Sequence, residues 1–245
     1  MKNLFNKGVK ILKEDTATGL IAVYKPYLLK SHPNKKIDNE SLLLCEYDHN
    51  HECYIDNENK SKIWLLNRLD STTTGIILLS TNPVTSKAVK KEFTNRTVIK
   101  NYHALVFGSD LAFKNDKTLK WCNNITINKN DTDKIRVSSS STSNLEAITY
   151  VNMIRKIDDD PSVLLINLQP KTGFTHQIRI QCEINGLPIV GDKTYGNFTL
   201  NKIFNRKRID YKKRLYLHSF SIQLTYIIDN KQYEFKYELP NDENW

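Results

Sequence analysis

The sequence predicts an α+β fold, because extended patterns outnumber helical ones and the two kinds are mixed along the chain without regular alternation. The chain has 245 residues, of which 39% are hydrophobic, enough for one substantial core and too many for a disordered chain. Gly (8) and Pro (7) are both few, so no linker-like stretch divides the sequence. We therefore expect one domain over residues 1–245, with no appended N-terminal module and a mixed, mainly antiparallel sheet flanked by helices and loops.

The first 80 residues are expected to form strands around a polar segment. Two short strands open the chain, with a turn at Thr18 and Gly19 between them. Residues 34–62 are polar and charged, except for an apolar patch over residues 41–47 that favours a short helix. An extended apolar stretch, a polar loop over residues 67–75 and a buried strand follow.

A helix is predicted over residues 82–95, with Asn82 as its N-cap and Pro83 in its first turn. The apolar stripe of this helix consists of Val84, Ala88, Val89 and Phe93.

The rest of the chain is expected to be mostly strands. The segment after the helix alternates as a strand, and one face of it carries Val98, Lys100, Tyr102, Ala104 and Val106. Residues 114–144 are polar, include the serine run 138–141, and predict strands joined by mobile loops. Strands are also predicted at 146–154, 162–170, 214–226 and 233–240. A helix from Thr175 is expected to end at Gly186.

The charge balance favours a polyanionic partner. Lys and Arg total 36 against 27 acidic residues, which gives a formal charge of +9 and a pI near 9.2. Each phosphate that such a chain neutralises releases counterions, so nucleic acid is a natural partner. A compositional bias toward Asn, Lys and Ile explains the same excess without any binding role, and charge alone does not separate the two.

The four cysteines have no paired spacing, which predicts free thiols in a reducing compartment. The first residues contain no apolar stretch long enough for a secretory signal, and no run reaches the length of a membrane span. One cluster raises a structural zinc as an alternative, namely Cys45, His49, His51 and Cys53. Its spacing is tighter than in the usual zinc frameworks, so we expect a solvated loop without metal.

Three segments carry residues suited to chemistry. Asp70 lies between Leu69 and a hydroxyl-rich turn, at the edge of an expected core, where a carboxylate needs donors or a cation. An Asp that caps a turn is the plainer interpretation. In residues 170–181, a glycine turn precedes a helix start that carries His176, Gln177 and Arg179, which suits an anion. An exposed basic helix end is the alternative there.

Tyr102 is the third candidate. Its strand neighbours of the same parity are mostly apolar, so by itself it is interpreted as a core tyrosine.

Taken together, the three segments resemble the RluA-type family of pseudouridine synthases. The family's Arg-Leu-Asp signature followed by a Thr-Ser-Gly-like turn is matched by NRLDSTTTGIILLS (67–80). Its Lys-x-Tyr-x-Ala-x-Val-x-Gly strand is matched by KNYHALVFG (100–108), and its third motif by TGFTHQIRIQCEINGLPIVGDKTYG (172–196). Weaker similarities are YKP, SHP and LHSFSIQL, and the resemblance runs from about residue 9 to about residue 240 in the family's order.

Three positions depart from the family's pattern. Asn67 stands where the family usually has His, Phe174 replaces a second Arg in the Thr-Gly turn, and Gln181 replaces a His after the helix arginine. Loss of the Arg at position 174 removes a cation suited to RNA backbone.

The resemblance implies an isomerase with the pseudouridine synthase fold that converts uridine to pseudouridine in structured ribosomal or transfer RNA, with base flipping and no cofactor. It implies Asp70 as the catalytic carboxylate, attacking C1′ or removing a sugar proton. Arg179 would keep that carboxylate ionised, and Tyr102 would stack on the uracil and transfer a proton.

The resemblance also implies a set of RNA-binding residues, namely Arg68, Lys100, Lys171, Thr175, His176 and Gln177. We expect RNA as the partner, no membrane and no obligate protein partner, in the cytoplasm or an RNA-containing organelle. The alternatives are a non-catalytic RNA-binding protein with the same fold, and a nucleotide hydrolase. The hydrolase needs a Gly-rich phosphate loop or clustered carboxylates, which the sequence lacks.

Overall fold

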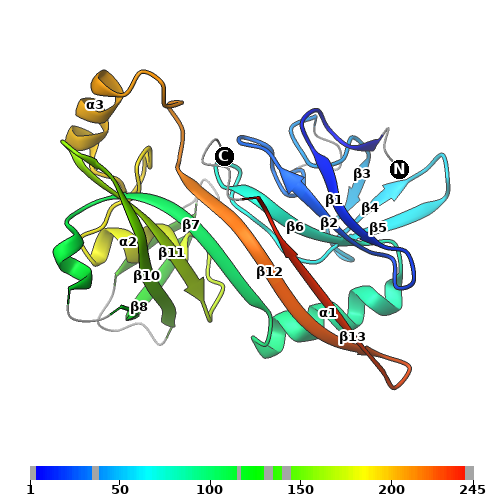
Figure 1. Cartoon of the computed structure of the whole chain (residues 1–245). Coiled ribbons are helices and arrows are strands. Elements are labelled where there is room, and N and C mark those ends of the chain that lie inside the picture. Colours follow the sequence, from blue (N-terminus) through cyan, green and yellow to red (C-terminus); the bar gives the residue numbers. More distant parts are fainter. Residues whose placement is uncertain (1–3, 35–38, 115–116, 130–134, 140–144, 241–245) are drawn as a thin grey trace. The chain divides into compact units, whose positions relative to one another are not determined.

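The computed structural model describes residues 4–34, 39–114, 117–129, 135–139 and 145–240 (Figure 1). The chain separates into two compact units. Unit 1 consists of residues 1–100 and 219–245, and unit 2 of residues 101–218. Both contain antiparallel strand pairs and helices, so the α+β class is confirmed. One domain over the whole chain stays a prediction.

Unit 1 is built around a sheet whose central strand is β6. In spatial order its strands are β3 (Glu46–Asp48), β4 (Cys53–Asp56), β5 (Ser61–Leu65), β6 (Thr74–Ser80) and β12 (Leu217–Ile228). Three further strands join this row, namely β1 (Lys10–Asp15), β2 (Leu20–Lys25) and β13 (Lys231–Glu238). All seven residues of β6 are buried, which explains its continuous apolar run. The predicted opening strand pair and the buried strand after the polar loop are confirmed.

Helix α1 (Pro83–Asn95) packs against β5 and β6 of unit 1 (Figure 1). The side chain of Asn82 accepts a hydrogen bond from Val84 N at 2.8 Å, so the predicted N-cap is confirmed. The predicted stripe is wrong at Val84, which is 51% exposed. Thr85 is buried there instead, because its hydroxyl donates to Thr18 O at 2.5 Å and draws that side of the helix inward.

The short helix predicted at residues 41–47 is wrong. Leu42 and Leu43 are both fully buried, which an extended chain allows when its two faces are covered. The backbone there bonds to distant segments, as in Leu42 N to Lys30 O at 3.0 Å and Leu44 N to Leu4 O at 2.8 Å. The loop expected at residues 45–53 is wrong in part, because β3 and β4 form an antiparallel hairpin in it.

Unit 2 contains a second row of strands. In order these are β7 (Ile99–Phe107), β11 (Ser162–Pro170), β10 (Glu146–Asp159), β8 (Leu119–Lys129) and β9 (Ile135–Ser139). The strands expected within residues 114–144 are confirmed where that segment is described, and part of its serine run lies outside the described residues. The strand predicted after α1 is confirmed as β7, although residues 102–107 are buried at every position, so burial does not alternate along it. A short 3₁₀ helix, Asp110–Phe113, follows β7.

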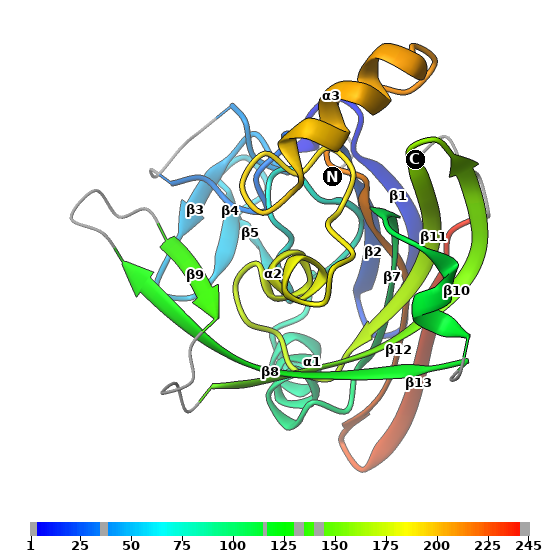
Figure 2. The same cartoon turned by 90° about the vertical axis from the view of Figure 1, so that its left-hand side faces the viewer.

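Two α-helices complete unit 2. Helix α2 (Gln177–Ile184) packs against β8 and β9 (Figure 2), and Gly186 after it has a φ of +72°, as predicted for a residue beyond a helix end. Helix α3 (Phe198–Lys207) was not predicted. None of the helices in the described ranges combines the length and apolar character needed to cross a membrane.

Candidate functional site

The loop between β5 and β6 in unit 1 carries Asp70. Buried Ser31 holds the residue before it, because Ser31 Oγ donates to Leu69 O at 2.7 Å and accepts from Leu69 N at 2.9 Å. The carbonyl of Ser31 in turn accepts from the Tyr54 hydroxyl at 2.7 Å. On the other side of Asp70, Thr73 N donates to the carbonyl oxygen of Asp70 at 3.0 Å. These bonds fix the backbone on both sides of Asp70, whose side chain is half-buried.

Lys25, at the end of β2, holds the next residue of the same loop. Its side chain is fully buried, and Nζ donates to Ser71 O at 2.9 Å, Leu29 O at 2.7 Å and Pro26 O at 3.1 Å. Burial lowers the pKa of Lys25 to about 7, and the charge of Asp70 opposes that shift. Three carbonyl acceptors match the three N–H groups of an ammonium, so we assign the charged form.

In the sequence, Lys25 belongs only to the weak similarity YKP, which predicts no role for it. The available signal was a cation at the end of a strand whose other residues are largely apolar.

Contacts within unit 1 also fix the two ends of the Asp70 loop. Gly75 has a φ of +114°, and a Cβ there would lie 2.2 Å from Ser219 O, so only glycine fits. Asn67 Oδ1 accepts a hydrogen bond from Leu78 N at 2.7 Å, which ties the loop start to β6. The departure from the family's His at position 67 therefore keeps a hydrogen-bonding side chain there.

Arg68 is exposed beside Asp70, and its Nη1 lies 3.4 Å from His32 Nε2. The His32 ring stacks on Tyr47, with the ring centroids 5.2 Å apart. Burial lowers the pKa of His32, which favours the neutral ring at pH 7. His32 Nδ1 lies 3.0 Å from Pro33 O and donates to it in that form, so Nε2 accepts from Arg68.

Unit 2 holds Arg179, on α2, through a buried ion pair with Asp192. Arg179 Nε donates to Asp192 Oδ2 at 2.8 Å and Nη2 to Oδ1 at 2.9 Å, a bidentate pair that does not involve Nη1. The side chains are 8% and 1% exposed. Burial alone would raise the pKa of Asp192, but the hydrogen bonds and charge of Arg179 lower it overall.

Asp192 also fixes the turn that follows it, since Oδ1 accepts from Thr194 N at 2.8 Å and Tyr195 N at 3.0 Å. The helix-start anion that the sequence predicted near Arg179 thus includes a carboxylate of the chain itself. The sequence predicts no role for Asp192 within the third motif, because nothing local marks it as a partner of a helix residue.

Gln177, at the first position of α2, is buried and supports the helix start. Its Oε1 accepts from the Thr172 hydroxyl at 2.8 Å and from Phe174 N at 3.1 Å, while Nε2 donates to Ile148 O at 3.2 Å and Thr149 Oγ1 at 3.1 Å. This geometry is that of a positioning residue. A direct RNA contact by Gln177 stays a prediction.

The other two departures from the family pattern have structural explanations in unit 2. Gln181 is fully buried, where Nε2 donates to Ala147 O at 2.9 Å and Oε1 accepts from the Thr149 hydroxyl at 2.6 Å. Phe174 packs on the small apolar cluster that contains Ile125 and Ile180. Both substitutions therefore contribute to packing around α2.

The remaining predicted residues lie as follows. Tyr102, on β7, is 9% exposed and is paired in register with Leu168 of β11. Lys171 is exposed, with Nζ 5.8 Å from the centroid of the Tyr150 ring. Thr175 is half-buried beside the start of α2, and Lys100 is half-buried at the end of unit 1.

Unit 2 brings His176 and Arg179 to the same tyrosine. His176 Nδ1 lies 3.0 Å from the Tyr195 hydroxyl, and the Arg179 guanidinium lies 5.1 Å from the centroid of that ring. Unit 1 carries Asp70 and Arg68 on one loop. The predicted contact between Asp70 and Arg179 joins residues of different units and stays a prediction.

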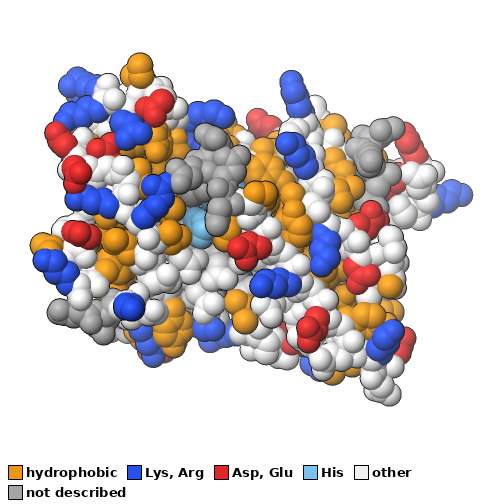
Figure 3. All heavy atoms as spheres, in the orientation of Figure 1, with side chains coloured by type: hydrophobic (Ala, Val, Ile, Leu, Met, Phe, Trp, Pro, Cys, Tyr) orange, Lys and Arg blue, Asp and Glu red, His pale blue; other side chains and the backbone are white. Residues whose placement is uncertain are grey.

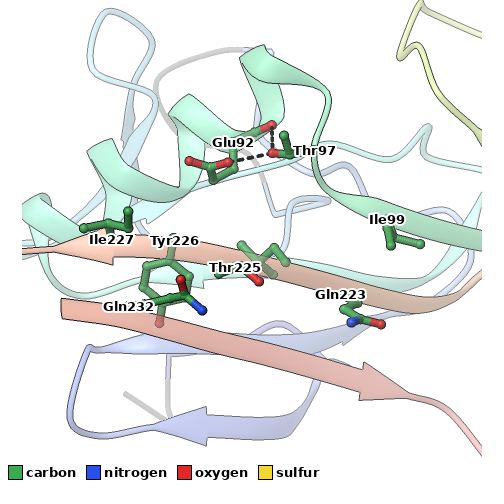
Figure 4. A pocket seen from close by; sticks show the side chains of 9 residues that line it. Glu92, Thr97, Ile99, Gln223, Thr225, Tyr226, Ile227 and Gln232 are labelled. Atoms are coloured by element: carbon green, nitrogen blue, oxygen red, sulfur yellow. Dashed lines mark hydrogen bonds between the residues drawn. The ribbon is translucent and has the colours of Figure 1, made fainter. Parts of the chain in front are cut away.

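A groove of about 340 Å³ lies elsewhere in unit 1, between the end of α1 and the β12–β13 hairpin (Figure 4). Glu92 is the only charged side chain among the nine residues that line it, and it accepts a hydrogen bond from the Thr97 hydroxyl at 2.6 Å. This lining does not suit a polyanion.

The residues of the zinc alternative have other neighbours in unit 1. Cys53 is buried in β4, His51 pairs with Asp48 at 2.6 Å, and His49 packs against the Tyr47 ring. Across the described ranges, no group of three or more His, Cys, Asp or Glu side chains is placed to hold a metal ion.

Comparison with known sequences gives a consistent result. Residues 19–184 match the family model described as RNA pseudouridylate synthase. The chain is 30% identical over 221 residues to "Ribosomal large subunit pseudouridine synthase C" of Rickettsia prowazekii, covering 90% of this chain and 65% of the relative. It is 26% identical to "Ribosomal large subunit pseudouridine synthase D" of Borreliella burgdorferi, covering 89% and 62%. The chain therefore spans less than two thirds of the length of these relatives.

Solved structures agree on the fold. "Human RNA Pseudouridylate Synthase Domain Containing 1" superposes with a TM-score of 0.67 at 19% identity, covering 96% of this chain and 84% of the other. "Human RNA Pseudouridylate Synthase Domain Containing 4" gives 0.63 at 22% identity, covering 94% and 88%.

Proposed function

Because the chain belongs to the RNA pseudouridylate synthase family, we propose that it isomerises uridine to pseudouridine in structured RNA. The observation that carries this proposal is the family match over residues 19–184, a stretch that includes Asp70, Tyr102 and Arg179. The geometry of the Asp70 loop supports it. Buried partners hold the backbone on both sides of a half-buried carboxylate, which suits a group that must meet a substrate in one orientation.

In the proposed reaction the bond between N1 and C1′ of uridine breaks, the detached uracil turns, and a bond between C5 and C1′ forms. The proton leaves C5 and one is gained at N1, so the product is an isomer and no electron donor or group donor is consumed. Asp70 acts on the sugar, either by attack at C1′ or by removal of a sugar proton. Tyr102 stacks on the uracil and transfers a proton.

Arg179 is proposed to keep Asp70 ionised. The Asp192 pair orients Arg179 through Nε and Nη2, so the guanidinium is held in one position within unit 2. Lys25 is a second cation beside the Asp70 loop, and its bond to Ser71 O adds to the order of that loop.

We propose large-subunit ribosomal RNA as the first substrate to test, because the names of the Rickettsia and Borreliella relatives specify the ribosomal large subunit. Arg68, Lys100, Lys171, Thr175 and His176 are proposed to contact this RNA. The protein would then act in a compartment that contains ribosomes.

The test uses Asp70→Asn and, as a matched control, Asp229→Asn in the exposed turn between β12 and β13. Tritium release from C5-labelled uridine in transcribed large-subunit ribosomal RNA measures turnover, and filter binding measures affinity. Asp70→Asn should lower turnover by about a thousandfold or more, because no carboxylate remains, and should leave affinity unchanged or slightly stronger. Asp229→Asn should behave as the wild type.

Substantial turnover by Asp70→Asn would refute the assignment of the carboxylate. If the wild type binds the RNA tightly and releases no tritium, the alternative of a non-catalytic RNA-binding protein is favoured instead.

A further inference from the structure

The positive charge of the chain is concentrated in one segment of unit 2. Seven of the thirteen residues from Lys202 to Arg214 are Lys or Arg, and only Asp210 is acidic. This local excess of six compares with a formal charge of +9 for the whole chain. A general compositional bias toward lysine does not produce so uneven a distribution. The segment covers most of α3 and the turn after it.

One side of α3 is anchored to unit 2. Phe204 is 1% exposed, and its ring lies 6.0 Å from that of Phe107 and 5.2 Å from that of Tyr211. Asn201 Oδ1 accepts from Gly191 N at 2.7 Å. A Cβ on Gly191 would lie 1.6 Å from Arg214 O, so the chain on either side of α3 is closely packed at this point.

Some of the cations have partners that explain them. Arg208 pairs with Asp158 at 2.7 Å, and Lys207 pairs with Asp160 on the connection between β10 and β11. Arg214 is buried, with its guanidinium 4.8 Å from the Tyr216 ring centroid. The four other cations of the segment are Lys202, Arg206, Lys212 and Lys213. Their side chains are exposed and form no ion pair or hydrogen bond with another residue in the described ranges.

Two apolar side chains accompany these cations. Phe198 is 66% exposed and Ile209 is 89% exposed. Phe198, Lys202 and Arg206 recur every four residues, so they share one face of α3. Figure 3 shows Lys and Arg side chains gathered on and around α3, in the upper left of the view. Favourable charges at a helix C-terminus account for Arg206 but not for Lys202, Lys212 or Lys213.

We infer that this surface is a second RNA-binding site, which holds backbone phosphates and is separate from the RNA-binding residues proposed above. We call it the α3 surface and define it by Phe198, Lys202, Arg206, Ile209, Lys212 and Lys213. Cations that track phosphates beside an exposed aromatic ring are the usual means of binding RNA without sequence readout. The inference rests on the proposed function for the identity of the RNA.

The opposite side of α3 leads to the candidate catalytic arginine. Asn201 Nδ2 donates to Asp192 O at 3.4 Å, and the Asp192 carboxylate holds Arg179. The helix that binds RNA backbone on its outer face thus contacts, on its inner face, the residue that orients Arg179.

The experiment compares two fourfold variants with the same change in charge. In the first, Lys202, Arg206, Lys212 and Lys213 are replaced by Gln. In the control, four exposed lysines of unit 1 are replaced by Gln, namely Lys60, Lys62, Lys87 and Lys91. The probe is transcribed large-subunit ribosomal RNA carrying C5-tritiated uridine, and both affinity and single-turnover tritium release are measured.

The α3 variant should bind RNA about tenfold or more weakly at ~0.1 M salt. The slope of log affinity against log salt should fall by about 3, because each lost phosphate contact removes ~0.7 to 0.9 from it. The rate at saturating RNA should stay within about twofold of the wild type. The control should lose less than about threefold in affinity. Phe198→Ala should weaken binding by a further small factor of about three.

Equal losses of RNA affinity in the two fourfold variants would mean that only the net charge of the protein matters, and would overturn the inference. An α3 variant with unchanged RNA affinity and a lower saturating rate would also overturn it. So would an α3 variant that loses binding to phosphatidylserine vesicles and keeps its RNA affinity. If the fourfold variant does not fold, Lys202→Gln with Arg206→Gln tests the same face. A wild type that binds the transcript without releasing tritium refutes the proposed function, while the binding data still decide the α3 surface.

Discussion

The loop of Asp70 in unit 1 and the arginine of α2 in unit 2 are held in different ways. Side chains reach the backbone of the Asp70 loop, as Ser31 does at Leu69 and Lys25 at Ser71. Arg179 is instead held through its own guanidinium, by a carboxylate that is 1% exposed. The bonds described in unit 1 hold the backbone beside the candidate catalytic side chain, whereas those in unit 2 hold the side chain itself.

The difference has an energetic consequence. A neutral hydrogen bond contributes about 1 kcal/mol to stability and one from a charged group about 1.5–3 kcal/mol, so the loop is held by several separate bonds. Removing one partner of a buried ion pair costs about 3–5 kcal/mol, because the other charge is left in the interior. We therefore expect graded effects from substitutions around Asp70 and an abrupt effect from a substitution beside Arg179.

Asp192→Asn is expected to have the largest effect on stability. It keeps the size of the side chain and removes the charge, so the free energy of unfolding should fall by about 3–5 kcal/mol. Asp158→Asn is the matched control, because its pair with Arg208 is 21% and 29% exposed and should contribute about 1 kcal/mol or less. Urea unfolding measures both. Equal losses would show that burial of the Arg179 pair is not what distinguishes unit 2.

Acidification should also weaken unit 2, through two buried histidines. Burial lowers the pKa of His103 to about 4, and burial together with Arg214 lowers the pKa of His218 to about 3. Both histidines have ordinary pKa values near 6.5 in the unfolded chain. Between about pH 6.5 and these lower folded values, the unfolded chain therefore binds more protons than the folded chain. The stabilisation is complete above about pH 6.5 and is lost as the pH falls.

Between pH 7 and pH 5 this loss should amount to about 2–4 kcal/mol in the free energy of unfolding. His218→Gln removes one of the two groups and should reduce that pH dependence by about half. Urea unfolding at the two pH values measures it, and an unchanged dependence in the variant would contradict the burial of a neutral His218.

Lys25→Met tests whether a cation can anchor a loop through carbonyls alone. Three buried carbonyl oxygens lose their donor at about 1 kcal/mol or more each, and relief of the burial of a charge offsets part of that loss. We expect a net loss of about 2 kcal/mol. Lys90→Met is the control, since its pair with Glu52 is 29% and 53% exposed and should contribute about 0.5 kcal/mol. A variant as stable as the wild type would mean that Lys25 is dispensable to the Asp70 loop.

Elements with strong local signals were predictable from the sequence. The Asn82 cap and its proline define the start of α1, and Gly186 defines the end of α2. The position of Asp70 between two apolar stretches predicted a loop at the edge of the core, and β5 and β6 flank it. These features depend on residues close together in the chain.

Features that depend on distant partners were not predictable. Lys25 and Ser71 are 46 residues apart, Ser31 and Leu69 are 38 apart, and Arg179 and Asp192 are 13 apart. Nothing local assigns these pairs. Likewise, consecutive leucines at 42 and 43 suggested a helix, although both are fully buried in a non-helical segment whose backbone bonds to Lys30. Helix α3 was missed because its many cations obscure the buried Phe204 that anchors it.

Ser31→Ala should have the smallest effect on stability and the most specific effect on the loop. The substitution removes one hydroxyl that both donates to Leu69 O and accepts from Leu69 N, so the free energy of unfolding should fall by about 1–2 kcal/mol. The Tyr54 hydroxyl still reaches the carbonyl of residue 31, so the chain path is kept. What is lost is the constraint on the residue directly before Asp70.

If the position of Asp70 limits the reaction, Ser31→Ala should lower the saturating single-turnover rate by about tenfold and leave RNA affinity within about twofold. Ser80→Ala is the matched control, because Ser80 is also buried in unit 1 and its hydroxyl donates to Asn82 O at 2.9 Å and accepts from Asn82 N at 3.1 Å, at the end of β6 away from the Asp70 loop. It should cost similar stability with no change in rate. Equal rates in the two variants would mean that hydrogen bonds to the backbone stabilise unit 1 without positioning Asp70. The contrast with Arg179 would then be one of stability alone.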